Sequence, residues 1–377
     1  MIIKSVKAWA IKDSRNETTI EVSVNGCKAS SPSGKSTGKY ESKPYHKNIE
    51  WNLKFLNSWN ELIEVSAFDD LKKIEKFIVK KAGLKDAKEF GANALFAFES
   101  AILKALAKEE RKELWQVVNE KAKKFPTPVG NVIGGGLHSS NKDRPEFQEF
   151  LLIPEGKTFK KKFKIMQSAH KEIKKIIKSK KKNDEGAWET SLYNEQVLGI
   201  LEGIDDVQIG IDVASSSFFK NGKYSYGKRV LSRRHQIDYI NSLIEKFGVF
   251  YLEDPLDEED FSGFSMVKKE GLVVGDDLTA SHLSRTKKAL KMKSINAMII
   301  KPNQNGSLLE ISELFKFCKK NGVKTVMSHR SGETMDNALA DYAFAFGADF
   351  IKTGVSTKWR ESKLKRMCEI ERKVSNK

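Results

Sequence analysis

Cysteine and proline are scarce in this sequence of 377 residues, which has three cysteines and eight prolines. Cys27, Cys318 and Cys368 are odd in number and far apart, so the sequence predicts neither a disulfide framework nor a cysteine-rich metal site. No segment approaches the roughly 18 uninterrupted apolar residues of a membrane helix, and Lys4 and Lys7 argue against a signal peptide. We therefore expect a cytoplasmic globular protein.

Acidic residues are in the minority. The chain has 67 lysines and arginines against 50 aspartates and glutamates, a formal net charge of +17. Such a charge would attract nucleic acid, anionic membranes or phosphorylated metabolites. The densest lysine runs, residues 157–164 and 171–182, carry apolar residues at helical spacing, which is typical of an amphipathic helix with a solvated lysine face. No nucleic-acid-binding motif accompanies them, so the charge leaves nucleic acid open as a partner without identifying one.

The order of patterns along the chain indicates two domains. Apolar and polar residues alternate in residues 2–11 and 18–24, as they do in β-strands. From about residue 51 to residue 124 the apolar spacing becomes helical. Pro126, Pro128 and a group of glycines follow. We therefore predict a small α+β domain at residues 1–125 and a second domain at residues 126–377.

Short apolar runs recur after Pro126, and each closes on a charged or titratable residue. The closing residues, which follow one another at intervals of 23 to 41 positions, are Asp212, Glu253, Asp276, Lys301, His329 and Lys352. This interval fits a strand, a helix and two loops. A (β/α) barrel has such a repeat, and its C-terminal strand ends collect catalytic groups from distant sequence positions. The sequence therefore predicts a barrel with a functional rim.

Three of these residues are carboxylates, and two are lysines. Asp212, Glu253 and Asp276 offer the oxygen ligands that suit Mg²⁺, although carboxylates paired with surface lysines are an alternative. Lys301 and Lys352 stand opposite them in the series. A lysine held near a dication and a second lysine has its neutral form favoured, which makes it a usable base.

Arg330 and Ser331 add a planar cationic fork and a hydroxyl group, which together suit a phosphate. A structural Arg330 paired with Glu333 is the alternative for this position. A metal, a lysine base and a phosphate-binding pair indicate abstraction of a proton next to a carboxylate, with the metal stabilising the enediolate that forms.

With these residues in place, the chain resembles the enolase (phosphopyruvate hydratase) family, in order and over nearly its whole length. The matching segments include PSGKSTG, NVIGGGLH, FQEFLLIP, LEDPLDEED, VGDDLT, IKPNQNGSLLE and SHRSGET. The resemblance implies an N-terminal α+β domain that caps a modified (β/α)8 TIM barrel. It also implies the Mg²⁺-dependent dehydration of 2-phospho-D-glycerate to phosphoenolpyruvate in glycolysis and gluconeogenesis, with two Mg²⁺ per active site and a homodimer or larger homo-oligomer.

The resemblance further implies a role for each matching side chain. The implied ligands are, for the first Mg²⁺, Asp212, Glu253 and Asp276 and, for the second, Ser36. The implied catalytic residues are Lys301 as the base, Glu149 and Glu185 in departure of the 3-hydroxyl group, and His138 and His329. The implied substrate-binding residues are Arg330 and Ser331 for the phosphate, Lys352 for the carboxylate, and Gln148.

Several positions depart from the usual family motifs, and none of them removes an implied catalytic group. The usual NVINGGSH, DEGGF, KVNQ and PSGASTG are changed here at Gly134, Leu137, Ala187, Trp188, Pro302 and Lys35. The chain is also shorter and more basic than family members usually are. Two further functions therefore stay open, a diverged dehydratase acting on a related acid and a non-catalytic paralogue that binds polyanions.

Overall fold

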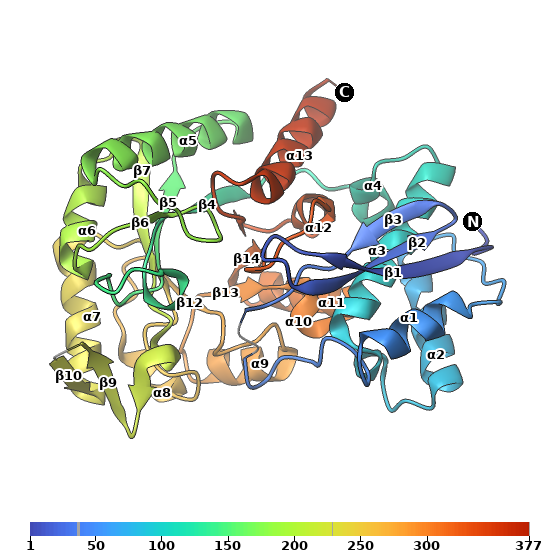
Figure 1. Ribbon diagram of the computed structural model, residues 1–377, viewed down its shortest axis with the longest axis horizontal. Coiled ribbons are helices and arrows are strands. Elements are labelled where there is room, and N and C mark those ends of the chain that lie inside the picture. The colour runs from blue at the N-terminus through green and yellow to red at the C-terminus, as the bar shows by residue number, and fades with distance from the viewer. Residues whose placement is uncertain (36–37, 228, 377) are drawn as a thin grey trace.

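The computed structural model describes residues 1–35, 38–227 and 229–376. Figure 1 shows the N-terminal elements, coloured blue to cyan, beside a larger part built from the rest of the chain. The N-terminal sheet is antiparallel, in the order β1-β2-β3. Its strands are β1 (Val6–Lys12), β2 (Thr18–Val24) and β3 (Cys27–Ser30). The two predicted strands are confirmed, whereas β3 was not predicted, although an Asn25-Gly26 turn precedes it.

Four helices complete the N-terminal part, in the segment whose helical spacing predicted them. They are α1 (Ile49–Asn57), α2 (Leu71–Ala82), α3 (Ala92–Glu109) and α4 (Leu114–Asn119), with the short 3-10 helices η1 (Phe68–Asp70) and η2 (Ala87–Phe90). Nearly all of α3 is buried, because it packs on β2 and β3 and also contacts α4 and α10. A helix that is apolar on most sides is suited to such a place.

Eight strands of the described chain close into a barrel. In ring order they are β4 (Thr127–Gly134), β5 (Glu149–Pro154), β7 (Val207–Asp212), β11 (Tyr251–Glu253), β12 (Leu272–Gly275), β13 (Ala297–Ile300), β14 (Lys324–Ser328) and β15 (Phe350–Lys352). Pairing of β15 with β4 closes the ring. Only β5 among these strands runs antiparallel to its neighbours, β4 and β7. The predicted fold, an N-terminal domain with a modified TIM barrel, is confirmed.

Helices surround the barrel. They are α5 (Phe159–Ile176), α6 (Asn194–Glu202), α7 (Arg233–Phe247), α8 (Phe261–Met266), α9 (Leu283–Lys291), α10 (Pro302–Asn305), α11 (Leu308–Lys320), α12 (Ala338–Ala345) and α13 (Lys358–Ser375). The shorter elements are η3 (Gly136–His138), η4 (Ser215–Phe218), β6 (Trp188–Glu189), and the three-stranded sheet of β8 (Phe219–Lys220), β9 (Lys223–Tyr226) and β10 (Arg229–Ser232). None of the described helices is both long and apolar enough to cross a membrane.

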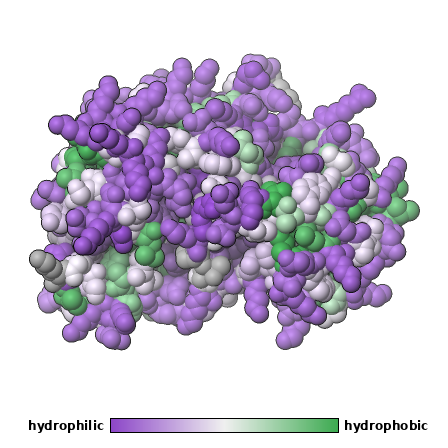
Figure 2. All heavy atoms as spheres, viewed as in Figure 1, coloured by the Kyte–Doolittle hydropathy of each residue, from purple (hydrophilic) through white to green (hydrophobic). Residues whose placement is uncertain are grey.

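Apolar side chains fill the barrel, and polar ones stand at its rim. The buried cluster inside the ring consists of Val129, Leu151, Ile153, Tyr251, Val274, Ala297, Ile299 and Val326. The outer surface is mostly hydrophilic in the view of Figure 2. The predicted amphipathic lysine-rich helix is also confirmed as α5, whose Phe159, Phe163 and Met166 are buried.

Candidate active site at the barrel rim

The strand ends bring the predicted side chains to one rim. At or directly after the ends of β7, β11, β12, β13, β14 and β15 stand Asp212, Glu253, Asp276, Lys301, His329 and Lys352. The register pairs Asp212 with Glu253 on one side and with Glu149 on the other. Because β5 runs antiparallel, its first residue reaches the rim that the other strands reach with their last. Three carboxylates therefore lie on three adjacent strands.

A cavity of about 310 Å³ opens at this rim. The predicted site residues that line it are His138, Gln148, Glu149, Glu185, Asp212, Asp276, Lys301, His329, Arg330, Ser331 and Lys352. Glu253 does not line the cavity and is fully buried. Ser36, the predicted ligand of a second Mg²⁺, lies outside the described residues. Lys35, Lys39 and Glu41 also line the cavity, so the N-terminal part contributes to its wall.

Lys352 is the cation at the centre of the carboxylates. Its Nζ lies 2.9 Å from Glu149 Oε2, 3.2 Å from Asp212 Oδ2 and 2.9 Å from Glu253 Oε2. Burial raises the pKa of Glu149 to about 7, although the charge of Lys352 opposes this. Burial likewise raises the pKa values of Asp212 and Glu253. Burial alone would lower the pKa of Lys352, but the three carboxylates raise it well above its ordinary value.

Lys301 is paired with Asp276 on the next strand. Burial opposes its charge, but Asp276 and Asp277 raise the pKa of Lys301. The predicted preference for a neutral lysine depends on a dication and a second lysine nearby. The observed contacts favour the charged forms instead, because each ammonium group faces carboxylates rather than another lysine. A divalent cation engaging the same carboxylates would weaken this preference.

The carboxylates fit a divalent cation only in part. Two groups of described side chains have ligand atoms within 4.8 Å of one another, namely His138, Glu149 and Glu185, and Asp254, Asp276 and Asp277. Of the three predicted ligands of the first Mg²⁺, only Asp276 belongs to either group. The carboxylates of Asp212 and Glu253 converge on Lys352 instead.

One further observation supports a cation at this place. Within the described chain, Oδ1 of Asp276 is buried and has no hydrogen-bond partner. A buried carboxylate oxygen without a donor is costly unless a cation or water satisfies it. The site therefore offers an unused acceptor next to two carboxylates that already converge on a positive charge.

A second corner of the cavity holds His138 with two glutamates. Nδ1 of His138 lies 3.6 Å from Glu149 Oε1 and 3.7 Å from Glu185 Oε2. Glu185 also accepts a hydrogen bond of 3.3 Å from Nδ2 of Asn131. Burial lowers the pKa of His138. With its pKa raised to about 7, Glu149 can gain or lose a proton near neutral pH.

Glu185 sits in a tight loop that Asn183 organises, a residue that the sequence analysis missed. Oδ1 of Asn183 accepts hydrogen bonds from the backbone N–H groups of Glu185 at 3.0 Å and Ala187 at 2.9 Å. The side chain of Asn183 lies against Gly134, where an added Cβ would come closer than 3.0 Å to its Nδ2. Gly134 thus leaves the space that Asn183 occupies. The Asn-Asp-Glu-Gly run is a turn signal that could have indicated this loop.

The Arg330 side of the cavity is built by residues from both parts of the molecule. Nη2 of Arg330 lies 2.7 Å from Glu41 Oε2. Oγ of Ser331 accepts hydrogen bonds from Arg15 Nη1 at 3.1 Å and from the Lys35 N–H at 2.7 Å. Lys35 and Lys39 also line the cavity, so a guanidinium group, a hydroxyl group and two ammonium groups are available to an anion, which would compete with Glu41 for Arg330.

Glu333 does not pair with the guanidinium of Arg330, which was the structural alternative. It accepts a hydrogen bond of 3.1 Å from the backbone N–H of Arg330, and its partner in an ion pair is Lys363 at 2.6 Å. His329 is buried, and burial together with the charges of Arg360 and Lys352 lowers its pKa well below the ordinary value. The neutral form of His329 is therefore favoured.

At the opening of the cavity, Lys35 donates a hydrogen bond of 3.0 Å to the backbone carbonyl of Leu137. The bond links the segment before residue 36 to the loop that carries His138, so two residues that depart from the usual family motifs meet here. As a whole, the cavity combines groups that can bind anions, hold a cation and move protons.

Comparison with known proteins matches this arrangement over nearly the whole chain. The family model described as the enolase N-terminal domain matches residues 3–118, and that of the enolase C-terminal TIM barrel domain matches residues 122–377. The enolase of Archaeoglobus fulgidus is 37% identical, over 98% of this chain and 97% of its own length. Those of Thermoplasma acidophilum and Ehrlichia ruminantium are 35% and 32% identical, each over 98% of this chain and over 98% and 96% of their own lengths. The chain therefore belongs to the enolase family, and its activity is that of an enolase, a phosphopyruvate hydratase that uses a divalent metal.

Proposed function

We propose that the cavity at the barrel rim dehydrates 2-phospho-D-glycerate to phosphoenolpyruvate, with two Mg²⁺ per active site. The observation that carries this proposal is the meeting of Lys301, Lys352, Arg330 and the rim carboxylates around one cavity. The proposal includes a division of the chain at residues 125 and 126, a cytoplasmic location, and a homodimer or larger homo-oligomer.

Asp212, Glu253 and Asp276 would hold the first Mg²⁺, and Ser36 would contribute to the second. When bound, the metal supplies positive charge that stabilises the enediolate form of the substrate. Oδ1 of Asp276 has no hydrogen-bond partner among the residues that the structure describes, and Asp212 and Glu253 converge on a cation; both observations support this assignment.

Arg330 and Ser331 would bind the phosphate, and Lys352 the carboxylate of the substrate. A phosphate accepts two parallel hydrogen bonds from a guanidinium group, which fits Arg330. Lys352 is held charged by its neighbours, so it is suited to binding an anion and not to accepting a proton. Gln148 and His329 line the cavity beside these groups and would contact the substrate as well.

Lys301 would take the proton next to the carboxylate. Asp276 favours the charged form of Lys301. A cation bound to Asp276 would weaken this interaction, and the neutral amine could then accept the proton. Glu185, assisted by Glu149 and His138, would donate a proton to the departing 3-hydroxyl group. The raised pKa of Glu149, about 7, supports a proton-holding role in this corner.

Separating the two steps by mutation tests these roles. Lys301→Ala should lose both product formation and exchange of the substrate proton with solvent. Glu185→Gln keeps the shape of the side chain but cannot donate the proton, so product formation should fall by about 10²-fold or more, while exchange persists. The measurement is deuterium in recovered 2-phospho-D-glycerate, read beside product formation in deuterated water.

A matched control is Lys316→Ala, because Lys316 is exposed and its one ion pair within the described part of the chain is with Glu313 at 2.8 Å. It should behave like the unmodified protein. Exchange that persists in Lys301→Ala, or that vanishes in a folded, metal-binding Glu185→Gln, would contradict the assigned roles.

A further inference from the structure

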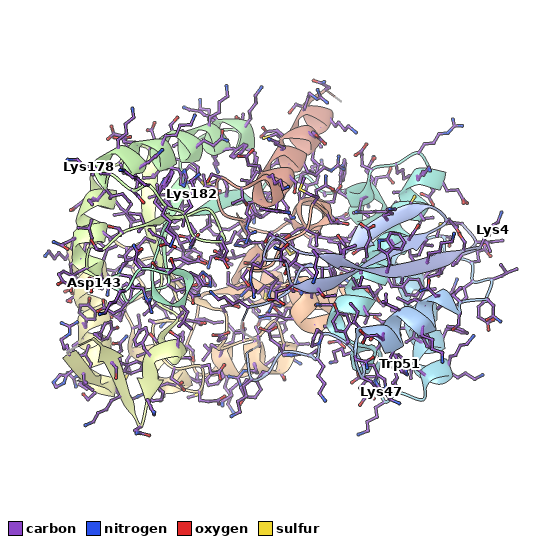
Figure 3. All side chains as sticks on the ribbon, in the orientation of Figure 1. Lys4, Lys47, Trp51, Asp143, Lys178 and Lys182 are labelled. Atoms are coloured by element: carbon purple, nitrogen blue, oxygen red, sulfur yellow. The ribbon has the colours of Figure 1, made fainter. Side chains whose placement is uncertain are left out.

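The outer face of α5 carries a row of lysines, Lys160, Lys164, Lys171 and Lys175, which we call the lysine row. All four are exposed. At 100° per residue their positions fall within about 60° of one another, and at 1.5 Å per residue the row is about 22 Å long. Beyond the helix the chain continues with Lys178 to Lys182, and Figure 3 shows Lys178 and Lys182 on the side of the molecule where α5 lies.

The lysine row has almost no acidic partners. Residues 157–182 contain twelve lysines and one acidic residue, Glu172. Among the described residues, Lys181 is the one lysine of this segment whose ammonium group lies within 4.0 Å of a carboxylate, that of Glu189 at 3.7 Å. The carboxylate of Glu371 accepts a hydrogen bond of 3.0 Å from the backbone N–H of Lys160 at the start of α5. Like charges one helical turn apart destabilise a helix. The repulsion within the row would be relieved by a polyanion bound along it.

On three other helices of the same molecule, an exposed basic residue is paired with an acidic one. Arg234 of α7 pairs with Asp238 at 3.1 Å. Lys316 of α11 pairs with Glu313 at 2.8 Å, and Lys365 of α13 pairs with Glu361 at 2.7 Å. Lys72, Lys76 and Lys80 of α2 have no such partner among the described residues either, but Asp69, Asp70 and Glu75 lie in the same stretch of sequence. The low density of acidic residues therefore distinguishes residues 157–182 from α2.

The packing of α5 decides what kind of polyanion suits the row. A membrane-surface helix inserts its apolar residues into the bilayer. The apolar residues of α5, among them Phe163 and Ile173, are instead buried in the protein and cannot do so. The nearby Trp188 is 7% exposed. Lys174 and Lys182 lie over its ring at 5.1 and 4.4 Å. It therefore cannot stack on an unpaired base, which single-strand binders commonly require.

We propose that the lysine row, with Lys178 to Lys182, binds the phosphate backbone of double-stranded nucleic acid without sequence preference. A straight row of ammonium groups makes phosphate contacts, and Gln167, the amide side chain of α5 on this face, is only half-exposed beside the longer, exposed lysines. This binding is separate from the dehydration at the barrel rim and does not depend on it.

The probe is a fluorescently labelled 20-base-pair RNA duplex, and the measurement is its anisotropy over a salt series. The row variant is Lys164→Gln, Lys171→Gln and Lys175→Gln together. A matched control is Lys72→Gln, Lys76→Gln and Lys80→Gln on α2. These lysines have a similar spacing and are exposed, but Asp69 and Asp70 precede them and Glu75 lies between them. Both variants remove three charges.

The slope of the logarithm of the binding constant against the logarithm of the salt concentration is negative. Its magnitude should decrease by about 2–3 in the row variant, since each lost phosphate contact removes roughly one unit or slightly less. The control should keep the slope of the unmodified protein, and all three proteins should turn over 2-phospho-D-glycerate equally, which shows that they are folded. Equal losses in both variants, no binding of the duplex at about 0.05 M salt, or tighter binding to vesicles with 30% phosphatidylserine than to the duplex would overturn the proposal.

Discussion

Gly134→Ala should slow the reaction without touching any catalytic group. The added Cβ would come closer than 3.0 Å to Nδ2 of Asn183, whose side chain has little room because it is buried. Asn183 would have to turn away and would lose its hydrogen bonds to the N–H groups of Glu185 and Ala187. At a net value of about 0.5–1.5 kcal/mol for each bond, the loop around Glu185 loses about 1–3 kcal/mol.

If the two hydrogen bonds of Asn183 hold Glu185 in its catalytic position, their loss should lower kcat by about 5- to 150-fold, while KM changes little. Steady-state kinetics with 2-phospho-D-glycerate measures both constants. Gly199→Ala is the matched control, because an added Cβ at this exposed helical glycine meets nothing within 4 Å. It should leave the kinetics unchanged.

A double-mutant cycle tests the reasoning more closely. Asn183→Gly removes the two hydrogen bonds without a clash, so it should be as slow as Gly134→Ala. The double variant should then be no slower than Asn183→Gly alone, since the side chain that the new Cβ meets is gone. Additive losses, or an unchanged kcat in Gly134→Ala, would refute the idea that these two residues act through one contact.

Three further predictions concern the rim itself. Arg330→Lys should lower kcat/KM by about 10- to 150-fold, because one charge-assisted hydrogen bond to the phosphate is lost; unchanged kinetics would make Arg330 structural. Mg²⁺ should raise the melting temperature of the protein, and Asp276→Asn should abolish the shift; a shift that survives would remove Asp276 from the ligands. The folded-state pKa of Glu149 is raised from 4.5 to about 7, so the folded protein binds the extra proton, and in the absence of divalent metal its stability should fall as pH rises from 4.5 to 7. Relative to Glu149→Gln, this loss in the free energy of unfolding should be about 3 kcal/mol. Urea denaturation measures it at each pH, and the same dependence on pH in both proteins would contradict the prediction.

The parallel strands were the part of the site that the sequence predicted well. Each barrel strand from β7 onward ends on, or directly before, its functional residue, so an apolar run followed by Asp276 or Lys301 is visible at a regular interval. Glu149 does not belong to this series, because β5 runs antiparallel and its functional residue precedes the apolar run. The family resemblance was needed to find it.

Residues that reach the site from elsewhere were harder to predict. Arg15 and Glu41 come from the N-terminal part and meet Ser331 and Arg330 through contacts between residues about 300 positions apart. Asn183 acts through the space that Gly134 leaves. No periodicity in the sequence records such contacts, since they depend on how separate loops pack.

The charge states of the two rim lysines could not be predicted from the sequence either. The strand ends predicted two lysines at the rim, but not that carboxylates would surround each of them. Lys352 lies at hydrogen-bond distance from Asp212 and Glu253, and these distances depend on the register of adjacent strands. Side-chain identity alone therefore predicted which groups meet, but not which of them are charged.

The most direct test of the central claim follows the ultraviolet absorbance of phosphoenolpyruvate after 2-phospho-D-glycerate is added to the protein. The account predicts that absorbance rises in the presence of Mg²⁺, stops rising when a chelator is added, and rises again when Mg²⁺ is returned in excess. Absence of product at high protein concentration with Mg²⁺ present, or a rate that the chelator leaves unchanged, would contradict it.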